Sequence, residues 1–365
     1  MKKFKIVGAG LYGLTLGRIL QDAGHSVTIY EKTRKLGGNC HTIERYGIEI
    51  HEKGAHIFHT DDDEVIKFVL GISEFNNYRH RVFAEVPTLG KHVELPMSYK
   101  TLADMYGTYD TSILDFTLGE STSRMRTGNS GLDELISQCS WDLFNFIIKP
   151  YSENQWGCSI DKVPTEAINR IRFKKEFTIG YFSDKFQGIP SKGYYRFFLE
   201  LSKYLTIKYD SHVTLDDLVE DDVTVIWSGD ICESLNNIES DALPYRTVFF
   251  NHNVECKGLF NSVINTPTRE YTRMIDHRLF RPEIDYNGQV VVSLEYPAMW
   301  TKDCGLDKMY PINNKENNSK YESIKSEVLS KYPNVIFGGR LGEYKYYDMD
   351  DTIKSAINLS KKLLS

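Results

Sequence analysis

The chain has 365 residues, of which 41% are hydrophobic and 26% charged, and this composition offers enough apolar surface for two or three folded domains. A formal net charge of −6 and the lack of a basic stripe argue against a nucleic-acid-binding protein. No apolar run is long enough to cross a bilayer. The six cysteines are scattered without a C-x-x-C pair, which indicates free thiols in a reducing cytosol and no metal site. We therefore expect a cytoplasmic protein.

The first thirty residues are typical of a strand, glycine turn, helix and second strand. Gly8, Gly10 and Gly13 form a G-x-G-x-x-G motif: the first glycine permits a tight turn, the second lets a pyrophosphate approach the backbone, and the third lets helix and strand pack closely. Glu31 ends the second strand, where a carboxylate can accept hydrogen bonds from a ribose. A secretory signal peptide is the weaker alternative, because no small-residue cleavage pattern precedes His25. The pattern predicts a dinucleotide site.

A second glycine pair follows soon after Glu31, in Leu36-Gly37-Gly38-Asn39. This arrangement resembles flavoproteins that bind FAD through the same fold more than it resembles a plain NAD dehydrogenase. We therefore expect FAD as the cofactor. The residues expected to contact it from this region are Gly8, Gly10, Leu11, Gly13, Glu31, Lys32, Gly38 and Asn39.

The rest of the chain alternates between elements of different type. Turn signals and amphipathic helical pieces occupy 76–150, apolar runs typical of antiparallel strands occupy 222–295, and a strand, glycine turn and helix follow from Asn334. The expected fold class is α/β: a Rossmann-like FAD-binding domain with an inserted helical domain and an antiparallel β-sheet domain. The expected boundaries are 1–75 plus about 190–240 and 315–365 for the FAD-binding domain, 76–150 for the helical domain, and 151–189 plus about 241–314 for the sheet, or substrate, domain.

Further segments with unusual chemistry are Gly54-Ala55-His56-Ile57-Phe58-His59-Thr60, Lys149 to Gly157, Tyr181 to Pro190, Glu270 to Arg273 and Phe337 to Met349. Together with the dinucleotide motif, and in this order, they resemble the motifs of the UDP-galactopyranose mutase family over nearly the whole chain. The resemblance implies an isomerase that interconverts UDP-galactopyranose and UDP-galactofuranose. In that family N5 of reduced FAD attacks the anomeric carbon, and the reaction is redox-neutral overall.

The resemblance also assigns roles to individual residues. Arg170 and Arg273 match two arginines that bind the diphosphate, and a guanidinium fork suits the charge that develops on a departing UDP. His56 and His59 match histidines on the sugar-facing side of the flavin. The remaining matches are Tyr181, Tyr310 and Tyr346 for the diphosphate or sugar, Tyr151 and Trp156 for the nucleotide and sugar pocket, and Arg340, Asp348 and Met349 beside the flavin. Packing or surface roles are the alternative for each of these residues.

One position departs from the family pattern. His80 stands where bacterial members commonly have asparagine, so dTDP-6-deoxygalactose (dTDP-fucose) stays open as the substrate beside UDP-galactose. His59 argues against UDP-N-acetylgalactosamine, because mutases for that sugar tend to carry arginine there.

Two other functional classes are weaker. A flavin oxidoreductase of the amine-oxidase type would not explain the paired arginines, and a non-catalytic binding protein would be expected to have lost Arg273 or Arg340. The sequence leaves the oligomeric state open, a homodimer included.

Overall fold

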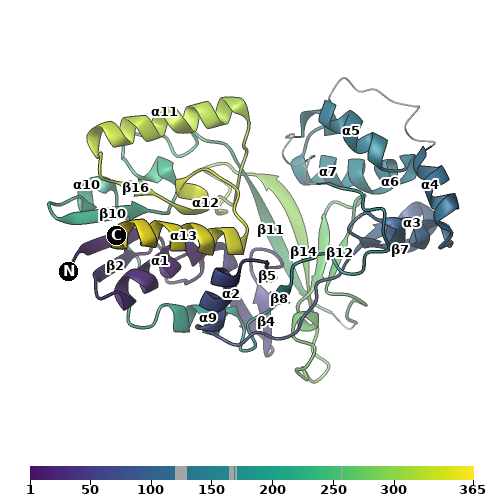
Figure 1. Ribbon diagram of the computed structural model, residues 1–365, viewed down its shortest axis with the longest axis horizontal. Helices are drawn as coiled ribbons and strands as arrows, with labels where there is room; N and C mark the ends of the chain where they lie inside the picture. Colours follow the sequence, from purple (N-terminus) through teal and green to yellow (C-terminus); the bar gives the residue numbers. More distant parts are fainter. Residues whose placement is uncertain (120–129, 164–167, 169–170, 256) are drawn as a thin grey trace.

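The computed structural model describes residues 1–119, 130–163, 168, 171–255 and 257–365. In Figure 1 an α/β domain lies at one end of the molecule and a group of helices at the other. The long strands of a second sheet run between them. Among the described residues, no helix has both the length and the hydropathy needed to cross a membrane.

The α/β domain is built on a five-stranded parallel sheet in the order β16-β10-β1-β2-β9. Its strands are β1 (Lys3–Val7), β2 (Ser26–Tyr30), β9 (Thr206–Lys208), β10 (Val223–Trp227) and β16 (Ile336–Phe337). Segments far apart in the sequence thus return to one sheet, which gives the Rossmann-like fold expected from the glycine motif. The α/β class is confirmed.

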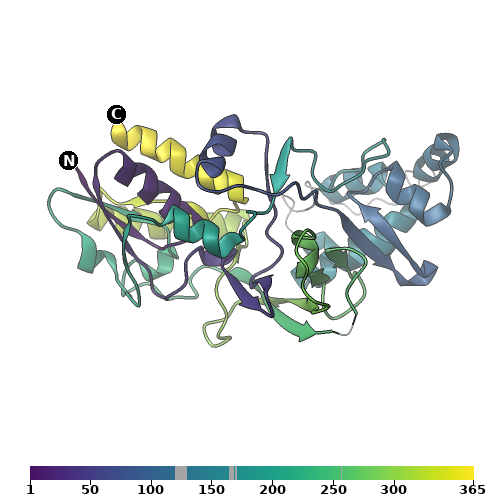
Figure 2. The same cartoon turned by 90° about the horizontal axis from the view of Figure 1, so that it is seen from below.

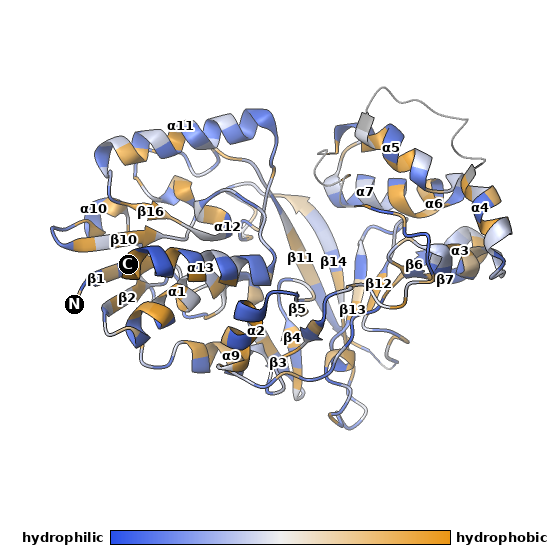
Figure 3. Ribbon diagram, viewed as in Figure 1, coloured by the Kyte–Doolittle hydropathy of each residue, from blue (hydrophilic) through white to orange (hydrophobic). Residues whose placement is uncertain are grey.

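Helices cover both faces of this sheet. They are α1 (Leu11–Asp22), α9 (Tyr194–Leu201), α10 (Leu215–Leu218), α11 (Lys315–Lys331), α12 (Gly339–Gly342) and α13 (Met349–Leu364). Helix α13 packs beside α1, and leucines at helical spacing in α1 are buried in the core between helix and sheet. On the other face, Tyr321 and Val328 of α11 share a buried cluster with Trp227. Hydrophilic residues dominate the visible side of α11 and α13 in Figure 3, as expected for amphipathic covering helices.

The second sheet has seven strands in the order β15-β11-β14-β13-β12-β6-β7. These strands are β6 (Val82–Val86), β7 (Lys91–Leu95), β11 (Tyr245–Val254), β12 (Val263–Asn265), β13 (Arg273–Asp276), β14 (Val291–Met299) and β15 (Tyr310–Pro311). All neighbours pair antiparallel except β12 and β6, which are parallel. The sheet is therefore mixed, not purely antiparallel as expected.

The range 76–150, expected to be helical, begins with β6 and β7. Val82, Ala84 and Val86 alternate into the core, a strand period of two that the surrounding turn signals obscured. The helices that follow are α3 (Tyr99–Tyr106), α4 (Thr111–Gly119), α5 (Ser130–Gln138), α6 (Trp141–Leu143) and, after a π-helical stretch (Phe144–Ile148), α7 (Lys149–Trp156). Helix α7 ends at Gly157, which has φ +64°.

Smaller elements connect the two sheets. They are β3 (Thr42–Arg45) paired with β4 (Ile48–His51), β5 (Phe58–Thr60) paired with β8 (Phe186–Gly188), and α2 (Asp63–Leu70). Figure 2 shows β8 between the α/β domain and the helical group. The β5–β8 pairing brings the histidine-rich segment beside residues 182–188, although more than a hundred residues separate them in the chain.

Candidate active site

A cleft of about 580 Å³ opens where the α/β domain, the mixed sheet and helix α7 meet. It gathers side chains from nine separate stretches of the described chain. The predicted residues that line it are His56, His59, His80, Tyr151, Trp156, Tyr181, Arg273, Tyr310, Arg340, Tyr346, Asp348 and Met349. Arg170 lies outside the described residues, so its place near Arg273 stays a prediction.

The glycine turn before α1 is packed too tightly for side chains. A Cβ on Gly13 would lie 2.1 Å from the carbonyl oxygen of Gly8, and Gly8 itself has φ +99°. A Cβ on Gly38 would lie 3.2 Å from the Cα of Gly10, so the two glycine motifs face each other. No side chain caps the first turn of α1, which begins at Leu11, and its backbone N–H groups are suited to an anion.

Glu31 ties the end of β2 to this turn. One carboxylate oxygen accepts a hydrogen bond from the N–H of Ala9 at 2.8 Å, and the other accepts one from the N–H of Thr33 at 2.9 Å. Neighbouring Lys32 lies 3.2 Å from the carboxylate of Glu233, an ion pair that the sequence did not predict. The expected contacts of Glu31, Lys32 and Asn39 with a cofactor stay predictions.

Arg273 projects from β13 into the cleft. Its Nε donates a hydrogen bond to the Tyr151 hydroxyl at 2.9 Å, and its guanidinium lies 3.5 Å from the carboxylate of Glu295. Glu295 is only 3% exposed and stands opposite Arg273 across β13 and β14. Burial alone would lower the pKa of Arg273, but Glu295 and the nearby tyrosines outweigh it and hold that pKa well above its ordinary value. The cleft therefore contains a fixed positive charge.

Arg340 supplies a second guanidinium on another wall. It donates to the carbonyl oxygen of Tyr347 at 2.5 Å, and its guanidinium carbon lies 5.6 Å from the ring centre of Tyr310 and 4.9 Å from that of Tyr346. The two tyrosine rings are nearly parallel, 6.2 Å apart. Cation–π contacts and the backbone bond hold this arginine in one orientation.

The predicted histidines have different surroundings. His59 lies 3.1 Å from the carboxylate of Asp184, and its ring stacks on Phe182 with centroids 3.6 Å apart. His80 stacks on the same phenylalanine, with its Nδ1 3.0 Å from the Tyr78 hydroxyl. Burial first, and then Arg340, lowers the pKa of His56 to about 4. The imidazole of His56 is therefore neutral near pH 7.

The comparisons with known proteins agree with this geometry. The sequence profile described as UDP-galactopyranose mutase matches residues 146–346, and one described as an NAD(P)-binding Rossmann-like domain matches residues 6–70. This chain belongs to the UDP-galactopyranose mutase family. The predicted enzyme class, a mutase, is thereby confirmed.

Curated relatives within this family cover nearly the full chain. The dTDP-fucopyranose mutase of Escherichia coli is 28% identical over 381 residues, which is 99% of this chain and 98% of that protein. The UDP-galactopyranose mutase of Mycoplasma genitalium is 28% identical over 382 residues, or 99% of this chain and 94% of its own. The two matches do not separate the two substrates.

Solved structures show the same fold. A crystal structure of reduced UDP-galactopyranose mutase aligns with a TM-score of 0.73 at 15% identity, covering 100% of this chain and 96% of that one. A putrescine oxidase redesigned in its cofactor binding aligns with a TM-score of 0.57 at 11% identity, covering 100% and 99%. Together with the Rossmann-like match, these likenesses show the fold that the chain shares with them, and FAD as its cofactor stays a prediction.

The polar residues that line the mutase cleft without having been predicted include Gln155, Arg246 and Asn265, and Glu295, the partner of Arg273, was not predicted either. The side-chain oxygens of Gln155 and Asn265 are buried and find no hydrogen-bond partner in the part of the chain that the structure describes. Both residues line the cleft, so both oxygens could accept hydrogen bonds from a ligand. For Glu295, the only signal in the sequence is a carboxylate within the apolar strand that begins at Val291.

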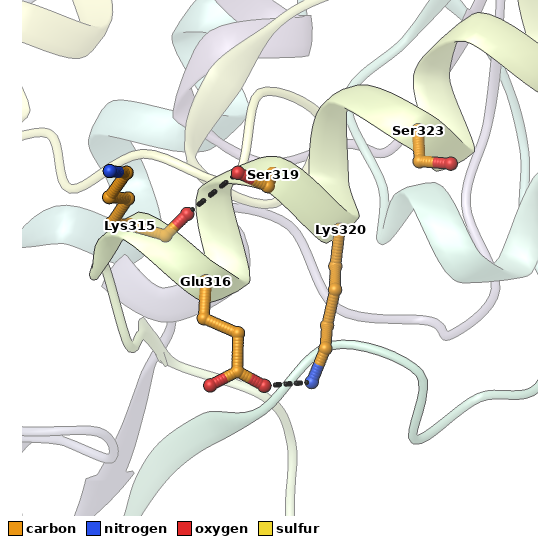
Figure 4. Close-up of a pocket in the computed structure, with 5 residues that line it drawn as sticks. All are labelled: Lys315, Glu316, Ser319, Lys320 and Ser323. Carbon is orange, nitrogen blue, oxygen red and sulfur yellow. Dashed lines mark hydrogen bonds and ion pairs between the residues drawn. The ribbon is translucent and has the colours of Figure 1, made fainter.

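A shallow hollow on α11 offers no comparable chemistry. The side chains around it are Lys315, Glu316, Ser319, Lys320 and Ser323. Figure 4 shows that Glu316 pairs with Lys320, at 2.7 Å, and that the Ser319 hydroxyl donates to the carbonyl oxygen of Lys315, at 2.9 Å. These are ordinary bonds along one turn of an exposed helix. The cleft is therefore the candidate active site.

Proposed function

We propose that this chain interconverts UDP-galactopyranose and UDP-galactofuranose, with reduced FAD as the cofactor. The observation that carries the proposal is the position of Arg273. It is held by Tyr151 and Glu295 on one wall of a cleft whose other wall presents Arg340 between two tyrosines. Family membership supplies the reaction class, and this geometry supports a substrate that carries an anionic diphosphate.

The residues before α1 fit the FAD pyrophosphate. The close approach of Gly13 to Gly8 excludes side chains, and the first turn of α1 offers uncapped N–H groups to a diphosphate. Glu31 stands at the end of β2, the position suited to a ribose. When bound and reduced, FAD would supply a nucleophilic nitrogen for the anomeric carbon, so that no electrons are consumed overall.

The residues of the chain would orient the substrate and stabilise the charge that develops on it. Arg273 would bind the diphosphate and stabilise the negative charge that grows as UDP leaves the sugar. Its bond to Tyr151 and its pairing with Glu295 fix its orientation beforehand. His56 is neutral near pH 7 and would offer a ring nitrogen as a hydrogen-bond partner without adding a charge.

A second candidate substrate, dTDP-fucopyranose, is favoured by His80. This residue is 5% exposed, lines the cleft and is held by Tyr78, whose hydroxyl also lies 2.5 Å from that of Ser262. Burial lowers the pKa of His80 to about 3, so a neutral imidazole would face the sugar. An imidazole is bulkier than an asparagine side chain and suits a smaller, less polar 6-deoxy sugar.

The test is to reduce the purified protein with dithionite and to incubate it with UDP-galactofuranose and, separately, with dTDP-fucofuranose. Pyranose formation is followed by chromatography. Conversion of the UDP sugar, and only by reduced protein, supports the proposal. Preferred conversion of the dTDP sugar would favour the second candidate, and a His80→Asn variant should then shift the preference toward UDP-galactofuranose. Conversion of neither sugar would refute both.

A further inference from the structure

A series of hydrogen bonds links three imidazoles, through backbone N–H groups and a serine hydroxyl, behind the cleft wall. The backbone N–H of His56 donates to Nδ1 of His51 at 3.0 Å, and the backbone N–H of His51 donates to Nδ1 of His277 at 3.3 Å. Nε2 of His277 and Nδ1 of His252 each lie 2.6 Å from the Ser293 hydroxyl. This hydrogen-bond series joins residues 54–56 to β4, to the turn after β13, and to the paired strands β14 and β11.

The direction of these hydrogen bonds follows from the backbone donors. A backbone N–H can only donate, so Nδ1 of both His51 and His277 must be unprotonated acceptors. Each neutral ring therefore carries its proton on Nε2. His277 then donates from Nε2 to Ser293, and the serine hydroxyl has its own proton left for Nδ1 of His252. One consistent set of tautomers satisfies all four bonds.

The surroundings keep the rings neutral. His51 is 1% exposed and His277 is 2% exposed, and the ring of His51 stacks on that of Phe280 with centroids 4.7 Å apart. Burial first, and then the neighbouring histidines and Arg281, lowers the pKa of His51 well below its ordinary value. Burial also lowers the pKa of His277 to about 3. Protonation of His51 would place an N–H opposite the N–H of His56.

We propose that His51 is a positioning residue, which holds the main chain at His56 and thereby fixes residues 54–56 as part of the cleft wall. Gly54, Ala55 and His56 all line the cleft, and His51 has no place in that lining. His277 and Ser293 act through His51. Nδ1 of His277 accepts from the backbone N–H of His51, and the bond from Nε2 of His277 to Ser293 fixes which ring nitrogen of His277 carries the proton. This inference rests on the proposed function, because it assigns a consequence to the sugar-nucleotide reaction.

Two variants of equal size distinguish the loss of the hydrogen-bond acceptor at position 51 from a change in packing there. In His51→Asn, the side-chain oxygen can take the place of Nδ1 and accept from the N–H of His56. In His51→Leu, the side chain has the same number of heavy atoms but no acceptor. We expect His51→Leu to lower kcat about tenfold with KM changed less than about twofold, because outer partners of a site typically contribute this much. His51→Asn should restore kcat to within about threefold of the wild type. Equal kcat in the two variants would overturn the proposal.

Ser293→Ala is a second variant that adds no bulk. It removes the acceptor for Nε2 of His277, and we expect a smaller decrease in kcat, about threefold, again with little change in KM. If His51→Leu does not fold, this variant and His51→Asn still decide the outcome. An unchanged kcat in Ser293→Ala, or a tenfold loss in His51→Asn, would contradict the positioning role.

A spectroscopic measurement on the wild-type protein needs no turnover. NMR spectra of protein with isotope-labelled histidine distinguish the two neutral tautomers, and His51 and His277 should both be Nε2–H forms at neutral pH. The Nδ1–H form or a charged ring at either position would refute the hydrogen-bond chain. If the wild type converted no sugar nucleotide but showed these tautomers, the proposed function would be refuted and the hydrogen-bond series would be confirmed.

Discussion

Acidification should destabilise this protein through its buried neutral histidines. Burial lowers the pKa of His80 and of His277 to about 3 in the folded chain. In the unfolded chain a histidine titrates near pH 6.5. Between these two values the unfolded state binds more protons than the folded state, so the free energy of unfolding decreases as the pH falls through about 6.5.

The size of the effect follows from the same two values. A pH of about 5 is about 1.5 units below the pKa of an unfolded histidine, so protonation of each such histidine favours unfolding by about 2 kcal/mol. His80 and His277 together should therefore lower the free energy of unfolding by about 4 kcal/mol relative to about pH 7.5. His51 acts in the same direction, because its pKa is also lowered by burial.

The assay is urea unfolding at about pH 7.5 and about pH 5 for the wild type, His80→Asn, His277→Asn and the double variant, at equal cofactor loading. The quantity compared is the change in unfolding free energy between the two pH values. Each single variant should reduce that change by about 2 kcal/mol, whatever its stability at neutral pH. If all four proteins lost the same free energy on acidification, the buried neutral histidines would not be its source.

Two substitutions test the cleft and the glycine turn. Arg273→Ala should lower turnover at least about a hundredfold, the usual order for removing a donor to developing charge. Arg269→Ala is the control, because Arg269 is exposed and is paired with a carboxylate outside the cleft lining. Its turnover should stay near that of the wild type in the same steady-state assay. Near-normal turnover in the first variant would mean that its assignment is wrong. Gly13→Ala places a Cβ 2.1 Å from the backbone oxygen of Gly8 and should abolish flavin retention, measured by visible absorbance; Gly17→Ala in the same helix meets only side-chain atoms, at 3.0 Å, and should retain it.

Local patterns made much of the α/β domain predictable. The glycine spacing and the apolar periodicity of residues 3–31 act within a single strand–helix–strand unit, so sequence alone placed β1, α1 and β2 correctly. Residues with distinctive chemistry within short motifs, such as Arg273 and Arg340, were also found to share one cleft. The strands β6 and β7 were missed, because turn signals surround them and obscure their alternating pattern.

Contacts that depend on pairing between distant segments could not be predicted. Glu295 reaches Arg273 only because β13 and β14 pair in the register that places the two residues opposite each other. Ser293 joins His277 to His252 for the same reason, since it lies opposite His252 in the neighbouring strand. A side-chain period shows which face of a strand is buried, but it does not reveal which residue stands across from it.

The most deeply buried ion pair in the described chain lies outside the cleft lining. Lys308 pairs with Asp230 and also donates to the carbonyl oxygen of Ser240, and its ammonium lies 4.3 Å from the ring centre of Trp300. Both charged side chains are almost fully buried, at 6% and 2% exposed. Removing one partner should therefore leave an uncompensated charge in the core.

Lys308→Met should lower the free energy of unfolding by about 3–5 kcal/mol, because Asp230 would stay buried without its cation. Adding Asp230→Asn should recover part of that loss, since the amide carries no charge. Urea unfolding of both variants at neutral pH measures the difference. Lys308 lies only two residues before Tyr310, so the single variant should also weaken UDP binding, measured by calorimetry. A Lys308→Met protein as stable as the double variant would show that the lone carboxylate of Asp230 is not shielded from water.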